Sequence, residues 1–103
     1  MAKLYITEYA QLGTDSIARG VFAPEEPPIA EQVVTFTTNA QSSAFNVNTR
    51  IVRVHVDAIS SLAFGTDPTA TTNNQRFTAG QTEYKAVRPD RDTGMKVAAV
   101  TNT

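Results

Sequence analysis

Apolar and polar residues alternate along most of this chain with a period of two. The alternation is clearest in "RIVRVHVDA" (50–58), where Val52, Val54 and Val56 fall on one face and mostly polar residues fall on the other. A strand with one buried face has this period, whereas a helix repeats its apolar positions every three or four residues. Weaker forms of the pattern, rich in β-branched and aromatic residues, occupy 3–7, 31–38, 60–65, 82–87 and 95–101. We therefore predict strands at all of these segments.

Turn-forming residues separate the predicted strands. Gly, Asp and Pro gather at 65–68, 79–81 and 88–94. Short strands separated by such turns are typical of sandwiches and barrels. We predict an all-β fold: a small β-sandwich with jelly-roll-like character, about seven short strands and long loops. The predicted core consists of Leu4, Ile6, Val34, Phe36, Val52, Val54, Val56, Leu62, Phe64, Tyr84, Val97 and Val100.

The composition narrows the possible partners. A length of 103 residues indicates one domain, which we place at 1–103. The formal net charge is −1, so no basic excess is available to attract nucleic acid. No apolar run approaches the roughly 20 residues of a membrane helix, and "MAKLYITEYAQLG" lacks the apolar centre of a signal peptide. We therefore expect neither nucleic acid nor a membrane as a partner. The chain has no cysteine, which excludes disulfides and thiolate chemistry.

Two long segments do not fit a tight succession of strands. The segment 10–30 contains three prolines, which favour an extended backbone, and we predict that it forms an arm or loop. The segment 66–79 is polar and rich in threonine. Stiff arms and polar loops suit contacts with neighbouring molecules, although surface loops also simply wrap over the ends of a sandwich. The predicted contact residues are Phe22, Pro24, Glu25, Glu26, Pro27, Pro28, Thr69, Thr71, Asn73 and Asn74.

Few residues suggest chemistry. His55 and Asp57 share one face of a predicted strand, and Glu83 is the carboxylate best placed to join them in a metal site. The alternative is a row of polar side chains facing solvent. An enzyme would need His55 and Asp57 in a deep pocket with another carboxylate. We predict no catalytic residue, no metal site and no cofactor, and we expect that the protein is not an enzyme.

The sequence "DRDTG" (90–94) matches the first half of a calcium-binding loop. The chain then enters the last predicted strand without supplying the remaining ligands. The alternative, which we favour, is a charged turn in which Arg88 and Arg91 balance the two aspartates.

Several stretches resemble small proteins encoded in the virion-structure modules of tailed bacteriophages and prophages. They are "MAKLYITEYAQLG", "EEPPIAEQVV", "TRIVRVHVDAISSLAFGTDPTATTNNQRFTAGQTEYKAVRP" and "MKVAAVTN", and together they span nearly the whole chain. The segments 49–87 and 95–100 carry the most specific part of the likeness. Several small β-sandwich or jelly-roll proteins of such modules are capsid cement or decoration proteins.

The resemblance implies a virion structural protein, most simply a capsid decoration protein that stabilises the head by binding across capsid subunits. The implied partners are the major capsid protein and copies of the chain itself, as a dimer or trimer. The implied location is the capsid surface, with the host cytoplasm before assembly. Two alternatives stay open: a neck, tail or fibre-associated component of the virion, and a β module that binds carbohydrate or another ligand.

Overall fold

The computed structural model describes residues 2–14 and 20–102, with the backbone alone for residues 14 and 20–22. Within those ranges the chain forms strands, turns and loops and contains no helix. The strands are β1 (Ala2–Tyr9), β2 (Leu12–Thr14), β3 (Gly20–Pro24), β4 (Ala30–Phe36), β5 (Ala40–Gln41), β6 (Ile51–Val56), β7 (Ser60–Gly65), β8 (Gln75–Phe77), β9 (Thr82–Ala86) and β10 (Lys96–Thr101).

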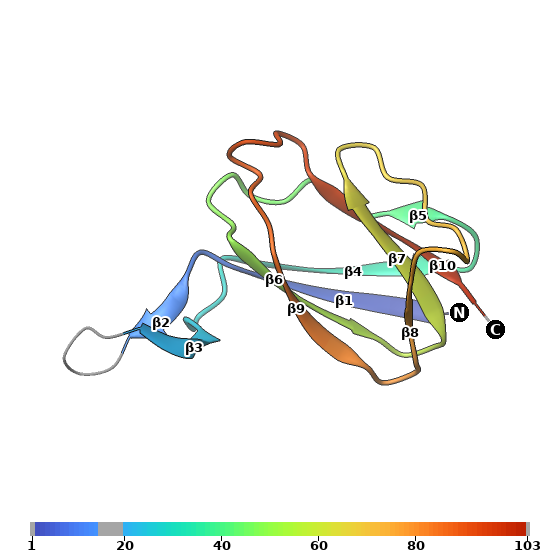
Figure 1. Cartoon of the computed structure of the whole chain (residues 1–103), viewed down its shortest axis with the longest axis horizontal. Coiled ribbons are helices and arrows are strands. Elements are labelled where there is room, and N and C mark those ends of the chain that lie inside the picture. The colour runs from blue at the N-terminus through green and yellow to red at the C-terminus, as the bar shows by residue number, and fades with distance from the viewer. Residues whose placement is uncertain (1, 15–19, 103) are drawn as a thin grey trace.

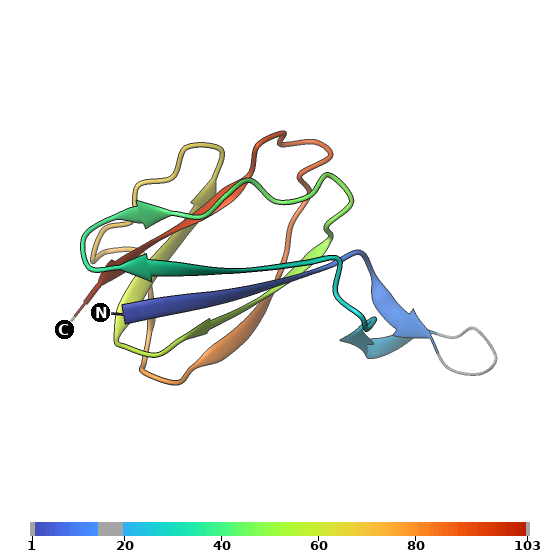
Figure 2. The ribbon, with the colours of Figure 1, turned by 180° about the vertical axis from the view of Figure 1, so that it is seen from behind.

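Eight of the strands form two antiparallel sheets that pack face to face (Figures 1 and 2). Sheet 1 has the order β4-β1-β6-β9, and sheet 2 has the order β5-β10-β7-β8. From β4 onward the chain crosses from one sheet to the other at every connection except that between β7 and β8. Repeated crossing between two four-stranded sheets is characteristic of jelly rolls. The prediction of an all-β sandwich is therefore confirmed, with ten strands in place of about seven.

The core lies between the two sheets. Nine of the predicted core residues are buried, among them Leu4, Phe36, Val54 and Val97. Phe64 is partly buried against this core, and Val100 is half-buried. The prediction for Tyr84 is wrong, because its side chain is 55% exposed on the outer face of sheet 1.

The remaining core volume is filled partly from outside the predicted strands. Phe45 lies in the loop before β6, and Phe77 ends the short strand β8; both are buried. Ala98 is also buried, so β10 does not show the simple alternation that the sequence suggested.

The segment 10–30, predicted to form an arm or loop, contains a two-stranded hairpin. β2 and β3 pair with each other and with neither large sheet, and they project from one end of the sandwich (Figure 1). At the base of the hairpin, the Glu25 N–H donates to the Gln11 carbonyl at 3.0 Å. The start of β1 and the end of β10 lie at the opposite end of the molecule (Figures 1 and 2). The hairpin and the two ends of the described chain therefore lie at opposite ends of the longest axis of the molecule, which measures 46 Å.

The threonine-rich segment 66–79 is held against the edge of sheet 2. The Gln41 side chain donates to the Asp67 carboxylate and to the Pro68 carbonyl, each at 2.9 Å. The Ala70 N–H donates to the Asn39 side chain at 2.7 Å. Ala70 itself is buried. These contacts give the segment a defined path over the sandwich.

Candidate functional site: the outer face of sheet 1

The outer face of sheet 1 is open to solvent and carries two exposed aromatic side chains, Tyr5 and Tyr84. Its cross-strand rows follow from the strand register: Val33, Tyr5, His55 and Thr82 form one row, and Glu31, Thr7, Arg53 and Tyr84 form the next. Sheet 2 covers only the inner face. A sheet in a sandwich normally turns polar residues outward. Tyr5 and Tyr84, together with Val33, depart from that pattern.

A shallow groove of about 620 Å³ crosses this face. The floor comes from three adjacent strands of sheet 1, and the lining residues are Tyr5, Ile6, Thr7, Glu31, Gln32, Val33, Arg53, His55 and Asp57. The rings of Tyr5 and His55 lie 6.1 Å apart at an angle of 55°. Small-molecule sites enclose most of their ligand, whereas this groove is open along its length. The shape is suited to contact with a surface or an extended chain.

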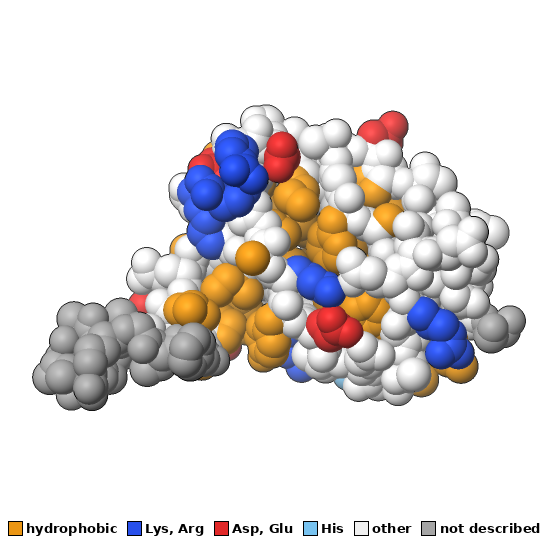
Figure 3. Space-filling model, in the orientation of Figure 1, with side chains coloured by type: hydrophobic (Ala, Val, Ile, Leu, Met, Phe, Trp, Pro, Cys, Tyr) orange, Lys and Arg blue, Asp and Glu red, His pale blue; other side chains and the backbone are white. Residues whose placement is uncertain are grey.

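A smaller apolar hollow of about 230 Å³ lies where the hairpin meets sheet 1. Leu12 and Pro24 line it from the hairpin, and Ile51 and Tyr84 line it from the sheet. Hydrophobic side chains gather at this junction beside β9 (Figure 3). Leu12 is itself exposed. The hairpin therefore extends the outer face of sheet 1 beyond the end of the sandwich.

Tyr9 connects the hairpin to the sheet. Its position in β1 points it outward, yet only 4% of it is exposed because the base of the hairpin folds over it. The Tyr9 hydroxyl donates to the Glu26 carboxylate at 2.9 Å. Burial, and next the hydrogen bond to Glu26, raise the pKa of Tyr9 to about 12. The neutral phenol is therefore the form that the fold stabilises.

We expect Tyr9 to make stability fall in alkaline solution. A pKa raised above the ordinary 10.0 contributes stability below pH 10, and this contribution disappears as the pH rises through about 12. Denaturant unfolding across that pH range should show that the free energy of unfolding falls more steeply with pH for the parent chain than for Tyr9→Phe. The variant should also lose the ionisation phase near pH 12 from a tyrosine absorbance titration. Equal pH slopes for the two proteins would contradict this assignment, and Tyr5→Phe is the control.

The structure separates the residues proposed for a metal site. His55 and Asp57 do lie on the outer face, but Glu83 pairs with Val54 and points to the opposite side of the sheet. The His55 Nδ1 lies 2.6 Å from the Thr82 hydroxyl, and the Asp57 carboxylate accepts the Lys3 N–H at 2.7 Å. Across residues 2–14 and 20–102, no three His, Cys, Asp or Glu side chains lie close enough to hold a metal ion.

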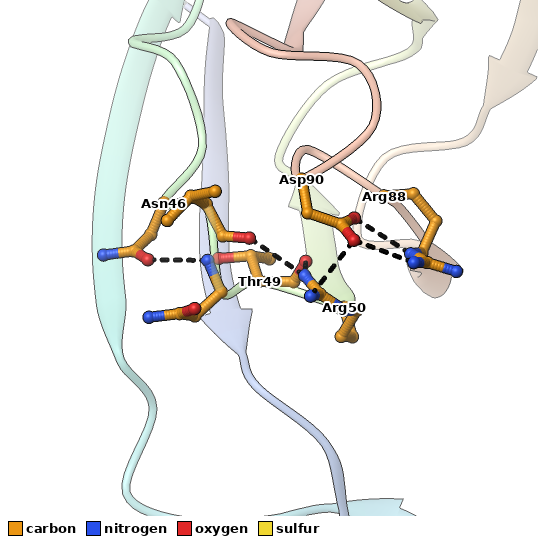
Figure 4. Close-up of polar contacts among 7 residues, drawn as sticks. Asn46, Thr49, Arg50, Arg88 and Asp90 are labelled. Atoms are coloured by element: carbon orange, nitrogen blue, oxygen red, sulfur yellow. Dashed lines mark hydrogen bonds and ion pairs between the residues drawn. The ribbon is translucent and has the colours of Figure 1, made fainter.

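The 88–94 turn is a charged turn in which Asp90 is paired with arginines (Figure 4). Arg88 donates two hydrogen bonds to the Asp90 carboxylate, at 2.9 and 2.8 Å, and Arg50 approaches the same carboxylate at 3.4 Å. The hydrogen bond from Arg88 is the main reason that the pKa of Asp90 falls to about 2. The turn thus joins the end of β9 to the loop before β6.

The predicted contact residues lie in two separate places. Pro24, Glu25, Glu26, Pro27 and Pro28 are at the base of the hairpin, and Thr69, Thr71, Asn73 and Asn74 are exposed on the segment beside sheet 2. Phe22 is in β3, but its side chain lies outside the described residues. Sequence reasoning did not identify Tyr5, Val33 and Tyr84 as one exposed group. The signal is present only in the strand order, which brings distant segments side by side.

No protein-family model, no curated protein and no solved structure matches this chain significantly. No helix in the part of the chain that the structure describes is long and apolar enough to cross a membrane.

Proposed function

We propose that this protein is a structural component of a tailed-phage virion, most simply a capsid decoration or cement protein that binds across capsid subunits. The observation that carries the proposal is the open outer face of sheet 1, where Tyr5, Val33 and Tyr84 lie exposed beside Arg53. Tyrosine and arginine are among the residues that contribute most energy at protein interfaces. The resemblance to small proteins of virion modules supplies the choice of particle.

The projecting hairpin supports a role that depends on contact area. A stable interface buries about 1,200–2,000 Å² in total, which is a large share of the surface of a small chain. The outer face and the hairpin together offer a continuous surface longer than either alone, with the apolar hollow between them. A cement protein placed over a joint would bring sheet 1 against one capsid subunit and the hairpin against its neighbour. A neck, tail or fibre-associated position would use the same surface.

One observation favours a second candidate, a module that binds carbohydrate. Glycans are often held against exposed aromatic rings, and Tyr5 and Tyr84 lie on one face of one sheet. Their rows are adjacent but their strands are separated by β6, which carries Arg53 and His55 between them. A binding experiment with oligosaccharides addresses this candidate directly.

Electron cryomicroscopy of purified particles tests the proposed function. Density for the chain repeated across the icosahedral lattice, with the hairpin reaching a second subunit, is the expected result. Density only at the portal vertex or tail would retain the virion role and reject the cement role. A chain absent from purified particles would overturn the proposal.

A further inference from the structure

We propose that two copies of this chain pair in solution along strand β4, edge to edge and antiparallel, so that the two copies of sheet 1 become one continuous sheet. The pairing itself needs no particle, and it rests on the proposed function only for its biological purpose. The partner is a second copy of this chain, related by a two-fold axis at Val33.

The backbone of β4 is free on one side. The Asp57 N–H donates to the Lys3 carbonyl, which continues the register of β1 and β6 by one residue and shows that the Lys3 carbonyl points toward β6. In an antiparallel sheet, the backbone groups of successive residues point to opposite neighbours. The next residue of β1, Leu4, therefore bonds to β4, where its partner is Val34. By the same alternation, the backbone groups of Glu31, Val33 and Thr35 point away from sheet 1.

The outward groups of β4 have no partner among the residues that the structure describes. No hydrogen bond among the described residues reaches the outward backbone N–H or C=O of Glu31, Val33 or Thr35. All three residues are exposed. Unpaired edge groups of this kind are a template for another strand. Each copy offers three outward N–H groups and three outward C=O groups, so two copies paired about Val33 would make about six hydrogen bonds between them.

Among the sheet edges described, β4 is the one best suited to such pairing. It has seven residues, all paired with β1 without a bulge, and none of them is proline or lysine. The edges of sheet 2 are β5 and β8, which have two and three residues. The other edge of sheet 1, β9, lies beside the hairpin, since Tyr84 and Leu12 line the same hollow. Proteins that avoid edge pairing shorten or obstruct their edge strands, and β4 shows neither device.

The side chains of β4 complement themselves across the proposed axis. Val33 would face Val33 of the second copy, and Glu31 would face Thr35, a hydroxyl donor opposite a carboxylate acceptor. Within each copy, Lys3 of β1 is the cross-strand neighbour of Thr35 in β4. The Lys3 ammonium of one copy would therefore lie in the same cross-strand row as the Glu31 carboxylate of the other. Apolar, hydrogen-bonding and opposite-charge pairs all stabilise adjacent strands. Val33 and Glu31 line the outer-face groove of each copy, so pairing along β4 would also join the two grooves into one.

The mass of the full chain in solution, measured by light scattering or sedimentation, tests the proposal. We expect the mass to rise from one chain toward two as the concentration increases to about 1 mM, where even a weak dimer is populated. Val33→Lys should abolish the rise, because two like charges would face each other at the axis. Tyr84→Lys is the matched control: Val33 is 54% exposed and Tyr84 55%, each on an edge strand of sheet 1. Circular dichroism checks that both variants fold.

A cross-link fixes the register. The chain has no cysteine, so Val33→Cys introduces a single thiol that should form a disulfide-linked dimer on mild oxidation. Tyr84→Cys should stay a monomer. A parent chain that is monomeric at every concentration would overturn the proposal, as would a dimer lost in Tyr84→Lys but kept in Val33→Lys. A dimer that persists for a chain absent from particles would leave the pairing intact and reject the virion role.

Discussion

Replacing Glu8 by alanine is expected to lower the free energy of unfolding by about 3 kcal/mol. Glu8 is 2% exposed, and one of its carboxylate oxygens accepts the Asn46 N–H at 2.8 Å and the Thr49 hydroxyl at 2.7 Å. Thr49 is completely buried. Alanine would leave both donors without an acceptor: the buried Thr49 hydroxyl would cost about 1–3 kcal/mol, and the Asn46 N–H, which is partly buried, would add a smaller loss.

Two variants make this result specific to the carboxylate of Glu8. Glu8→Gln keeps an oxygen acceptor of the same length, so its loss should be well below that of Glu8→Ala. Glu31→Ala removes an exposed carboxylate from the neighbouring strand and should change stability by less than about 0.5 kcal/mol. Urea unfolding of the three variants beside the parent gives the comparison. Equal losses for Glu8→Ala and Glu31→Ala would show that the loop before β6 is held by other contacts.

Tyr5→Ala and Tyr84→Ala are each expected to weaken rebinding to particles that lack the protein by about 30-fold, or roughly 2 kcal/mol. Each substitution removes a large exposed ring from the outer face of sheet 1 without opening the core. The expectation rests on the proposed docking of that face on the particle. Titration of purified protein onto depleted particles measures the affinity.

Val47→Ala is the matched control for the tyrosine variants. Val47 is 56% exposed, but it lies in the loop before β6 and not on the outer face of sheet 1. Its removal should leave particle binding unchanged. If Val47→Ala weakened binding as much as Tyr84→Ala, or if neither tyrosine variant weakened it, the docking surface would have to lie elsewhere on the protein.

Strands with a strong alternating pattern were predictable from the sequence. β1, β4 and β6 alternate because one face of each packs on the core and the other faces solvent. β5 and β8 have too few residues to show any period. The hairpin strands β2 and β3 were missed because the three prolines indicated an extended arm or loop and gave no sign of strand pairing. Pro24 is compatible with the pairing because it ends β3, which is an edge strand.

The exposed position of Tyr84 was not predictable from its own strand. In "TEYKAV" an aromatic residue alternates with Glu83 and Lys85, and the pattern favours a buried tyrosine. In the structure these two charged residues point inward at the edge of the sandwich, where they form an ion pair at 3.1 Å. The Lys85 ammonium lies 5.9 Å from the centre of the Phe77 ring. Long charged side chains can close the open edge of a sandwich because their aliphatic stems cover apolar surface while their charges reach water.

The groove depends on long-range neighbours that no local pattern contains. Tyr5 and His55 are far apart in the sequence and become adjacent only because β6 pairs with β1. The resemblance to virion proteins indicated a contact role but not the face that would carry it. The strand order of sheet 1 therefore adds the one feature on which the proposed docking depends.

The order of the strands also determines when the chain can fold during synthesis. β1 is made first but lies between β4 and β6, so one of its edges can pair once Phe36 has left the ribosome and the other only after Val56 has followed. β10 is made last and lies between β5 and β7, so sheet 2 is completed only by the final strand. A truncation that reaches into β1 or β10 removes an inner strand, whereas β2 and β3 pair only with each other among the strands that the structure describes. Insertions and tags that must not disturb folding therefore belong between β2 and β3, and truncations into β1 or β10 should leave a chain that cannot close its sheets.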